Sequence, residues 1–306
     1  MKKLILASWK DSTKSQYDTY LKQWESFCRA QDRDVLKGNF ALALEFLYQL
    51  YHKGLSYSAI NTARSALSSV LPTKDGVEFG MHKLVCRFMK GVFNVKPSLP
   101  KYASVWDPDV VLRFLKRWTP RSRLTLKQLT LKITMLLALL TSQRAQTLHL
   151  MKLSGITFTS DRVQIVVDAL LKTSCPTWHL EPIVFEKYDT CKSLCIFRYL
   201  KTYIDRTSTM RTSENQLLVS YMKPHKAVTK STVSRWIRTV MSKAGVDVSI
   251  FKAHSTRAAS SSKASHFVSI DRILKAGGWK SSSCYVKHYK LPTSSKSLAP
   301  ALLQNM

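Results

Sequence analysis

The period with which apolar residues recur along the chain constrains its fold most. Up to about Val95, apolar and aromatic side chains recur every three to four residues, which is the period of an amphipathic helix. They are Tyr17, Tyr20, Leu21, Trp24, Phe27, Ala43, Leu44, Phe46, Leu47 and Leu50. The pattern predicts four or five short helices. One of them covers residues 56–71, with Ser56 and Ser58 as candidate N-caps and Arg64 on a polar face that could lie against a phosphate backbone.

Two prolines interrupt this pattern. Pro97 and Pro100 lie within residues 96–101, and proline disfavours a helix both at its own position and at the residue before it. We therefore place a linker at residues 98–104, between a helical domain (1–97) and a second domain (105–290), with a C-terminal tail at 291–306. A chain of 306 residues with 45% apolar residues is long enough for two buried cores.

The second domain combines the helical period with the period-two alternation of a β-strand. Helical patterns cover residues 107–118, 126–151, 194–203, 231–243, 254–264 and 269–276. Between them, residues 156–159 and 163–167 alternate with period two around the polar turn 160–162, which predicts a β-hairpin. A third strand is expected within residues 177–185. The fold class is therefore mainly α, with one small antiparallel β-sheet.

The charge of the chain indicates a polyanionic partner. Its 48 Lys and Arg residues face 19 Asp and Glu residues, giving a formal net charge of +29. Residues 1–100 carry 15 basic and 8 acidic side chains and the remainder carries 33 and 11, so both domains are positive. Such a balance argues against a small-molecule enzyme and suits two domains that bind one DNA duplex. A ribosomal or other general basic protein is the alternative on charge alone.

Neither a metal site, a disulfide framework nor a membrane span is predicted. The six cysteines form no C-x-x-C pair. The opening Met1-Lys2-Lys3 resembles the start of a signal peptide, but the apolar run that follows is too short for export. The longest apolar stretch, residues 133–140, is far below the roughly 20 residues that cross a bilayer. We expect an intracellular protein with reduced thiols.

A set of separated basic and aromatic residues carries the functional prediction. His254 and Arg257 are three residues apart, which places them on one face of a helix. Such a pair alone is usually a surface or capping feature. The order of the full set is more specific; it comprises Arg144, Lys172, His254, Arg257, the run Gly277-Gly278-Trp279, and Tyr289. This order resembles the tyrosine recombinase or phage integrase family. The local sequences around Arg144, His254 and Trp279 are most similar to recombinases of eukaryotic mobile elements, the DIRS-type retroelements and cryptons.

The resemblance implies an architecture and an activity. The fold would be a C-shaped, two-domain clamp on double-stranded DNA, with a helical core-binding domain and a catalytic domain. The protein would be a site-specific recombinase or integrase of a mobile element that acts in transposition through a 3′-phosphotyrosine intermediate. It would work as a homotetramer on two DNA sites, a dimer on each, in the nucleus of a eukaryote or otherwise in the cytoplasm with the DNA.

The resemblance also assigns roles. Arg144 and Arg257 would hold the non-bridging phosphate oxygens. His254 would donate to the phosphate or move the proton of the nucleophile. Lys172 would protonate the departing 5′-oxygen; Lys187 also follows a strand and is the alternative. Trp279 stands where the family has His or Trp and can donate but not shuttle a proton; its other reading is a core tryptophan.

The nucleophile is expected to be Tyr289. Tyr285 is the competing tyrosine, but the family's spacing from the Trp279 position matches the longer interval. A phenol has a pKa of about 10, so attack needs a base or a strongly cationic pocket. No cofactor, nucleotide or metal is expected, because the chain has neither a phosphate-binding loop motif nor a carboxylate cluster with two-metal spacing.

One departure from the family pattern bears on activity. The family commonly has an acidic residue three positions after the first arginine, and this chain has Thr147 there. Either Gln146 or Thr147 would have to orient Arg144 through neutral hydrogen bonds. Two alternatives to a recombinase stay open: a domesticated, non-catalytic DNA-binding protein, and a topoisomerase with the same chemistry. The tail, with Leu298, Leu302, Leu303 and Met306, is either a disordered end or a segment that docks on a neighbouring protomer.

Overall fold

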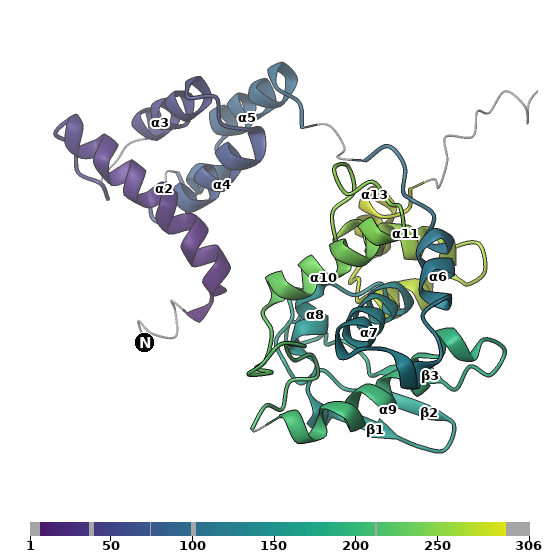
Figure 1. Ribbon diagram of the computed structural model, residues 1–306. Coiled ribbons are helices and arrows are strands. Elements are labelled where there is room, and N and C mark those ends of the chain that lie inside the picture. The colour runs from purple at the N-terminus through teal and green to yellow at the C-terminus, as the bar shows by residue number, and fades with distance from the viewer. Residues whose placement is uncertain (1–6, 37–39, 74, 99–101, 212, 292–306) are drawn as a thin grey trace, which may run out of the picture. The chain divides into compact units, whose positions relative to one another are not determined.

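The structure, a computed structural model, describes residues 7–36, 40–73, 75–98, 102–211 and 213–291. The chain divides into two compact units, residues 1–101 and 102–306 (Figure 1). None of the described helices is both long enough and apolar enough to cross a bilayer. The C-terminal segment proposed to dock on a neighbour, residues 292–306, lies outside the described residues.

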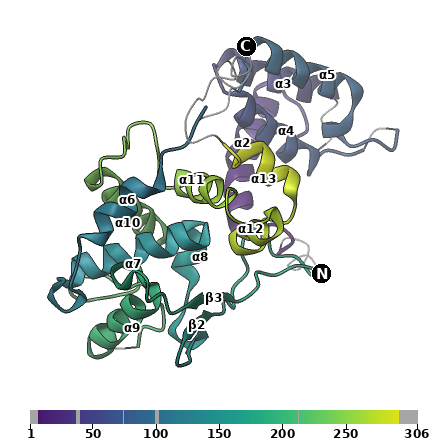
Figure 2. The same cartoon turned by 90° about the vertical axis from the view of Figure 1, so that its right-hand side faces the viewer.

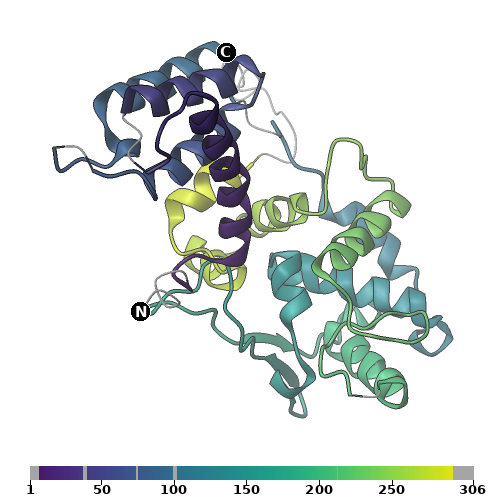
Figure 3. The ribbon, with the colours of Figure 1, turned by 90° about the vertical axis from the view of Figure 1, so that its left-hand side faces the viewer.

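The first unit is helical, as predicted. Its described elements are α2 (Asp11–Ala30), α3 (Phe40–His52), α4 (Tyr57–Ser68), the 3-10 turn η1 (Phe79–Met81) and α5 (Lys83–Val95). The long helix α2, purple in Figure 3, packs along α4. The core between the helices contains Trp24, Leu47 and Ile60, all fully buried. Apolar residues of the predicted period therefore face this core.

Helix α4 begins and ends at serines. The hydroxyl of Ser56 accepts a hydrogen bond from the backbone N–H of Ala59, which confirms one of the two candidate caps; Ser58 lies within the helix. The helix ends at Ser68, before the predicted residue 71, and just beyond its end the hydroxyl of Ser69 donates to the carbonyl of Ala66. Arg64 is half-buried rather than on an open polar face.

The second unit is built around one buried helix. Its α-helices are α6 (Pro108–Lys116), α7 (Leu126–Thr141), α8 (Ala145–Leu150), α9 (Ile196–Thr207), α10 (Lys230–Lys243), α11 (Ser255–Ala264), α12 (Ile270–Gly277) and α13 (Ser282–His288). Helix α7 packs against α8, α9, α10 and α11, and 12 of its 16 residues are buried. Helices α11, α12 and α13 follow one another side by side (Figure 2).

A three-stranded antiparallel sheet lies beside α9 (Figure 1). Strand β1 (Ile156–Phe158) pairs with β2 (Arg162–Ile165), which confirms the predicted hairpin, and β2 pairs with β3 (Ile183–Glu186). The third strand is shorter than predicted. Residues Cys175 and Trp178 instead close a tight turn on themselves through two backbone hydrogen bonds.

The predicted helix over residues 126–151 is wrong as a single element. Helix α7 stops at Thr141, Ser142 adopts a left-handed conformation with φ 52°, and α8 starts at Ala145. The hydroxyl of Thr141 accepts a hydrogen bond from the N–H of Gln143 and holds this corner. The other predicted helices are confirmed, with ends shifted by no more than four residues, whereas α13 was not predicted.

Candidate active site

The break between α7 and α8 positions Arg144. Because Ser142 is left-handed and Arg144 is extended, with φ −74° and ψ 151°, Arg144 occupies the N-cap position of α8. Its side chain lines a cavity of about 280 Å³ in the second unit. A continuous helix would have carried Arg144 along the flank of α7, so the corner that periodicity missed is what brings this arginine to the cavity.

Four of the six predicted functional residues line this cavity. They are Arg144, Lys172, His254 and Arg257. The remaining lining residues are Gln143, Ala145, Gln146, Lys230, Ser234, Ile237, Ala253 and Thr256. No Asp or Glu residue is among the twelve. The cavity is therefore strongly cationic and suits an anionic group such as a phosphate.

Arg257 forms the buried floor of the cavity. It lies on α11, is fully buried, and its Nη1 donates to the carbonyl oxygens of Ser142 (2.5 Å) and Gly277 (2.8 Å). Its Nε and Nη2 are buried without a partner among the described residues. Burial, and then repulsion from Arg144, lowers the pKa of Arg257 to about 9. A desolvated cation with two unused donors would be stabilised by an incoming anion.

Trp279 lies behind Arg257 rather than in the cavity lining. The guanidinium carbon of Arg257 is 3.9 Å from the centre of the Trp279 ring, a cation–π contact. Trp279 packs in a small cluster with Ile273 and Tyr285, and its Nε1 is buried without a partner in the described part of the chain. The turn before it requires glycine, because a Cβ on Gly277 would stand 1.7 Å from the Trp279 ring.

The two candidate tyrosines have different environments. Tyr285 is fully buried and its hydroxyl donates to the carbonyl of Ser261. Tyr289 is half-buried, and its hydroxyl lies 3.1 Å from Nε2 of His254. The Tyr289 ring centre is also 5.1 Å from the guanidinium carbon of Arg257. Of the two tyrosines, Tyr289 is the one whose hydroxyl lies beside His254. It follows directly after α13, and its N–H donates to the carbonyl oxygen of Tyr285.

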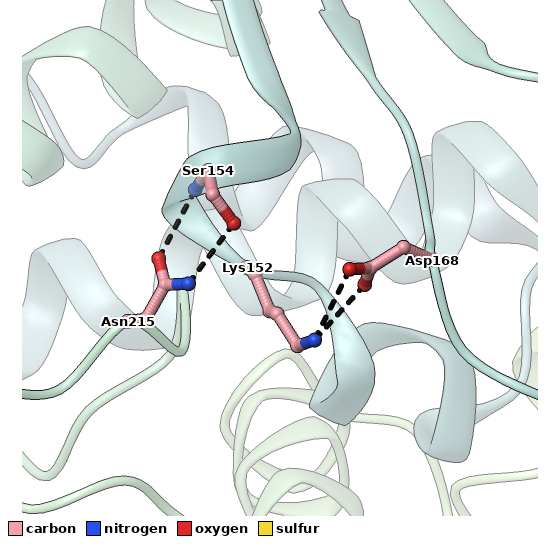
Figure 4. A network of polar contacts seen from close by, with 4 residues as sticks. All are labelled: Lys152, Ser154, Asp168 and Asn215. Carbon is pink, nitrogen blue, oxygen red and sulfur yellow. Dashed lines mark hydrogen bonds and ion pairs between the residues drawn. The ribbon is translucent and has the colours of Figure 1, made fainter.

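Lys172, rather than Lys187, faces the cavity. Lys172 lies in the segment between β2 and β3 and lines the cavity, whereas Lys187 is 3.8 Å from Asp189 in an ion pair outside it. The start of the Lys172 segment is anchored by Asp168, whose carboxylate pairs with Lys152 at 3.1 Å (Figure 4). Lys152 follows α8, so the pair links the segments that carry Arg144 and Lys172.

Thr147 forms a hydrogen bond to Gln143. Its hydroxyl donates to Oε1 of Gln143 at 3.1 Å, and Nε2 of Gln143 donates to the carbonyl of Ala276 at 2.6 Å. Thr147 therefore orients Gln143, which ties the α7–α8 corner to the end of α12. Gln146 lines the cavity beside Arg144. Sequence reasoning missed Gln143, Lys230 and Ser234, because none of them has a recognisable motif.

The arrangement has the groups that phosphoryl transfer to a phenol needs. A phenol and an imidazole share a hydrogen bond beside two guanidiniums, and an ammonium lines the same cavity. If Nε2 of His254 is unprotonated, it can accept the proton of Tyr289. Guanidinium donors can hold the charge that gathers on a phosphate in its transition state.

Comparisons with known proteins agree with this geometry. The family model described as "Phage integrase family" matches residues 107–295, more than half of the chain. No curated protein matches the chain in sequence.

Solved structures of DNA-bound recombinases share the fold. A lambda integrase (75–356) dimer bound to a COC′ core site has a TM-score of 0.57 and 16% identity, covering 96% of this chain and 94% of that chain. The Tn1549 transposon integrase (82–397) in complex with circular intermediate DNA has a TM-score of 0.57, 13% identity and coverages of 97% and 94%. A lambda integrase tetramer bound to a Holliday junction has a TM-score of 0.55 and 16% identity, covering 96% of this chain and 76% of that chain. The chain belongs to the phage integrase family of tyrosine recombinases.

Proposed function

We propose that the chain is a site-specific DNA recombinase or integrase of a mobile element that cleaves DNA through a 3′-phosphotyrosine at Tyr289. One observation carries the proposal: the Tyr289 hydroxyl lies 3.1 Å from His254 Nε2 and beside the unused buried donors of Arg257. A protein that only binds DNA has no need for a phenol in this position.

The proposed reaction conserves the phosphodiester energy. The Tyr289 oxygen attacks the phosphorus and its proton passes to Nε2 of His254, while the bond between phosphorus and the 5′-oxygen breaks. Lys172 gives a proton to the departing 5′-oxygen. Arg144 and Arg257 hold the non-bridging oxygens as charge develops on them. A 5′-hydroxyl attacking the phosphotyrosine reverses the sequence and rejoins the DNA.

The mobile-element role and the assembly are part of the proposal. The local sequences around Arg144, His254 and Trp279 support DIRS-type retroelements or cryptons as the source, which would place the protein in a nucleus. The net charge of +29 supports double-stranded DNA as the partner. A homotetramer on two DNA sites is proposed by analogy with the lambda integrase tetramer on a Holliday junction.

A covalent-trapping assay tests the proposal. Wild-type protein and Tyr289→Phe are incubated, without added metal, with end-labelled nicked duplexes from a pooled library, and the products are separated on denaturing gels. A protein-linked DNA band that requires Tyr289 is the expected result. Tyr285→Phe is the matched control and keeps the band, since Tyr285 lies in the core. A band that persists in Tyr289→Phe would overturn the assignment.

A non-catalytic DNA-binding protein is the second candidate function. It is favoured by one observation: Thr147 stands where the family commonly has an acidic residue, and its hydroxyl donates to Gln143. This candidate predicts binding that weakens steeply with salt and never becomes covalent. A topoisomerase would form the same covalent band but would reseal the DNA without exchanging partners, so a strand-exchange substrate separates it from a recombinase.

A further inference from the structure

Lys230 is a cation of the active-site cavity that the six predicted residues do not include. It is the first residue of α10, and Ser234, one turn later, lines the same cavity. Ile237, the next residue along this face, is 2% exposed and packs in the core. Because Ile237 fixes the rotation of α10, Lys230 is held toward the cavity by the packing of the helix rather than by chance.

The place of Lys230 is unfavourable for folding alone. A helix N-terminus carries partial positive charge, which disfavours a cation there, and the first turn of α10 has no acidic residue. Within the described part of the chain, Lys230 forms no ion pair with a carboxylate. The side chain is exposed, whereas Arg257 and Ile237 are buried, so Lys230 lies at the rim of the cavity and Arg257 at its floor. An anion at the rim would offset the repulsion between Lys230 and the helix N-terminus and would also give Lys230 an ionic partner.

The donors at the floor are enough for one phosphate. A phosphodiester has two non-bridging oxygens, and the two guanidiniums of Arg144 and Arg257 already supply more donors than these oxygens need. Lys172 is assigned to the departing oxygen. A fourth cation at the rim, Lys230, therefore has no oxygen left to bind on the same phosphate.

We propose that Lys230, with the hydroxyl of Ser234 as a second donor, holds the neighbouring phosphate of the cleaved strand. The inference rests on the proposed function, because it takes the attacked phosphate to be the one at Arg144 and Arg257. Lys230 is a positioning residue: it fixes the register of the DNA backbone so that the right phosphate lies over Tyr289. As a point charge it carries no base preference.

Ethylation interference tests this contact without requiring cleavage. A duplex recovered from a random-sequence pool by binding to wild-type protein is ethylated at single phosphates, and bound and free DNA are compared for each variant. Lys230→Ala is expected to lose sensitivity at one phosphate only, and Lys230→Arg to keep it. The slope of log affinity against log salt should fall by about 0.9 in Lys230→Ala. Lys243→Ala, at the exposed far end of the same helix, keeps sensitivity at that phosphate.

A second variant locates the contact relative to the active site. Arg144→Ala marks the central phosphate in the same assay, and the phosphate lost in Lys230→Ala should be its immediate neighbour. An unchanged interference pattern in Lys230→Ala would overturn the proposal. So would loss of the central phosphate itself, which would assign Lys230 to the attacked group. If wild-type protein forms no covalent band, the proposed function fails, while the interference pattern still decides the Lys230 contact.

Discussion

The guanidinium of Arg257 packs on the ring of Trp279, with its carbon 3.9 Å from the ring centre, and donates hydrogen bonds to the carbonyl oxygens of Ser142 and Gly277. The ring therefore supports Arg257 from the side facing away from the cavity. Since the guanidinium has no carboxylate partner among the residues that the structure describes, the ring and the two carbonyl oxygens of Ser142 and Gly277 hold it in place. Trp279 can therefore act by supporting Arg257, without touching DNA.

The support role predicts different effects for two substitutions of Trp279. Trp279→Ala should lower the free energy of unfolding by about 3–5 kcal/mol, the usual cost of removing a buried tryptophan side chain. Trp279→Phe keeps a ring under Arg257, so the rate of covalent-complex formation should fall by less than about tenfold. Denaturant unfolding and the trapping assay measure the two effects. If Phe abolishes cleavage while leaving stability near wild type, the indole N–H acts on the DNA instead.

The order of the basic residues predicted much of the site, but their spatial relations came only with the fold. Arg144, Lys172, His254 and Arg257 could be chosen from sequence because they follow a family order, and the structure places all four around one cavity. Lys230 could not be chosen, because a lysine at a helix start is common and only packing shows where it points. The contact of Thr147 with Gln143 was equally invisible, since side-chain partners depend on the corner at Ser142.

Lys172 is predicted to act as the acid for the leaving oxygen. Lys172→Ala should slow cleavage by about 10²–10⁴-fold, the usual contribution of a general acid. DNA in which sulfur replaces the bridging 5′-oxygen should restore the rate, because a thiolate leaves without needing a proton. The rate of covalent-complex formation on both DNAs is the measurement.

Lys187→Ala provides the matched control for Lys172. Lys187 is paired with Asp189 and lies outside the cavity, so its loss should leave cleavage unchanged on either DNA. Rescue by sulfur in Lys187→Ala and not in Lys172→Ala would reverse the assignment of the two lysines. No rescue in Lys172→Ala would show that this lysine holds the phosphate rather than protonating the leaving group.

Elements of the fold were predictable where buried side chains recur with the period of a helix. They were not predictable where the conformation of one residue ends a helix. Helix α10 was predicted within one residue of its start because Val233, Trp236 and Ile237 recur on one face. The end of α7 was not, because the left-handed Ser142 leaves no mark on the apolar pattern. Helix α13 is short, and only Tyr285 among its residues is buried, so its sequence carries too weak a period to detect.

The Lys152–Asp168 pair should matter more for activity than for stability. Both side chains are largely exposed, at 41% and 60%, so the pair contributes less than about 1 kcal/mol to the free energy of unfolding. Asp168 lies four residues before Lys172, and Asp168→Asn should slow cleavage several-fold by loosening that segment. Exchanging the charges, Lys152→Asp with Asp168→Lys, should recover part of the rate. If Asp168→Asn cleaves at the wild-type rate, the anchor has no role.

A buried lysine gives the protein a pH-dependent stability. Lys132 of α7 is fully buried, its Nζ donates to the carbonyl oxygens of Leu115 and Trp118, and burial lowers its pKa from 10.5 to about 8. Between these values the unfolded chain binds more protons than the folded one, so the free energy of unfolding should rise as pH increases from about 8 toward 9.5. Above that range Tyr199, whose ring centre is 4.0 Å from Nζ of Lys132, opposes the trend, because burial raises its pKa and its ionisation favours the unfolded chain. Urea unfolding of wild-type protein and Lys132→Met at several pH values measures the effect. Arg257, whose pKa is also lowered, to about 9, adds a rise that both proteins share. The rise should therefore be larger in the wild type than in Lys132→Met, and an equal rise in the two proteins would assign all of it to other groups.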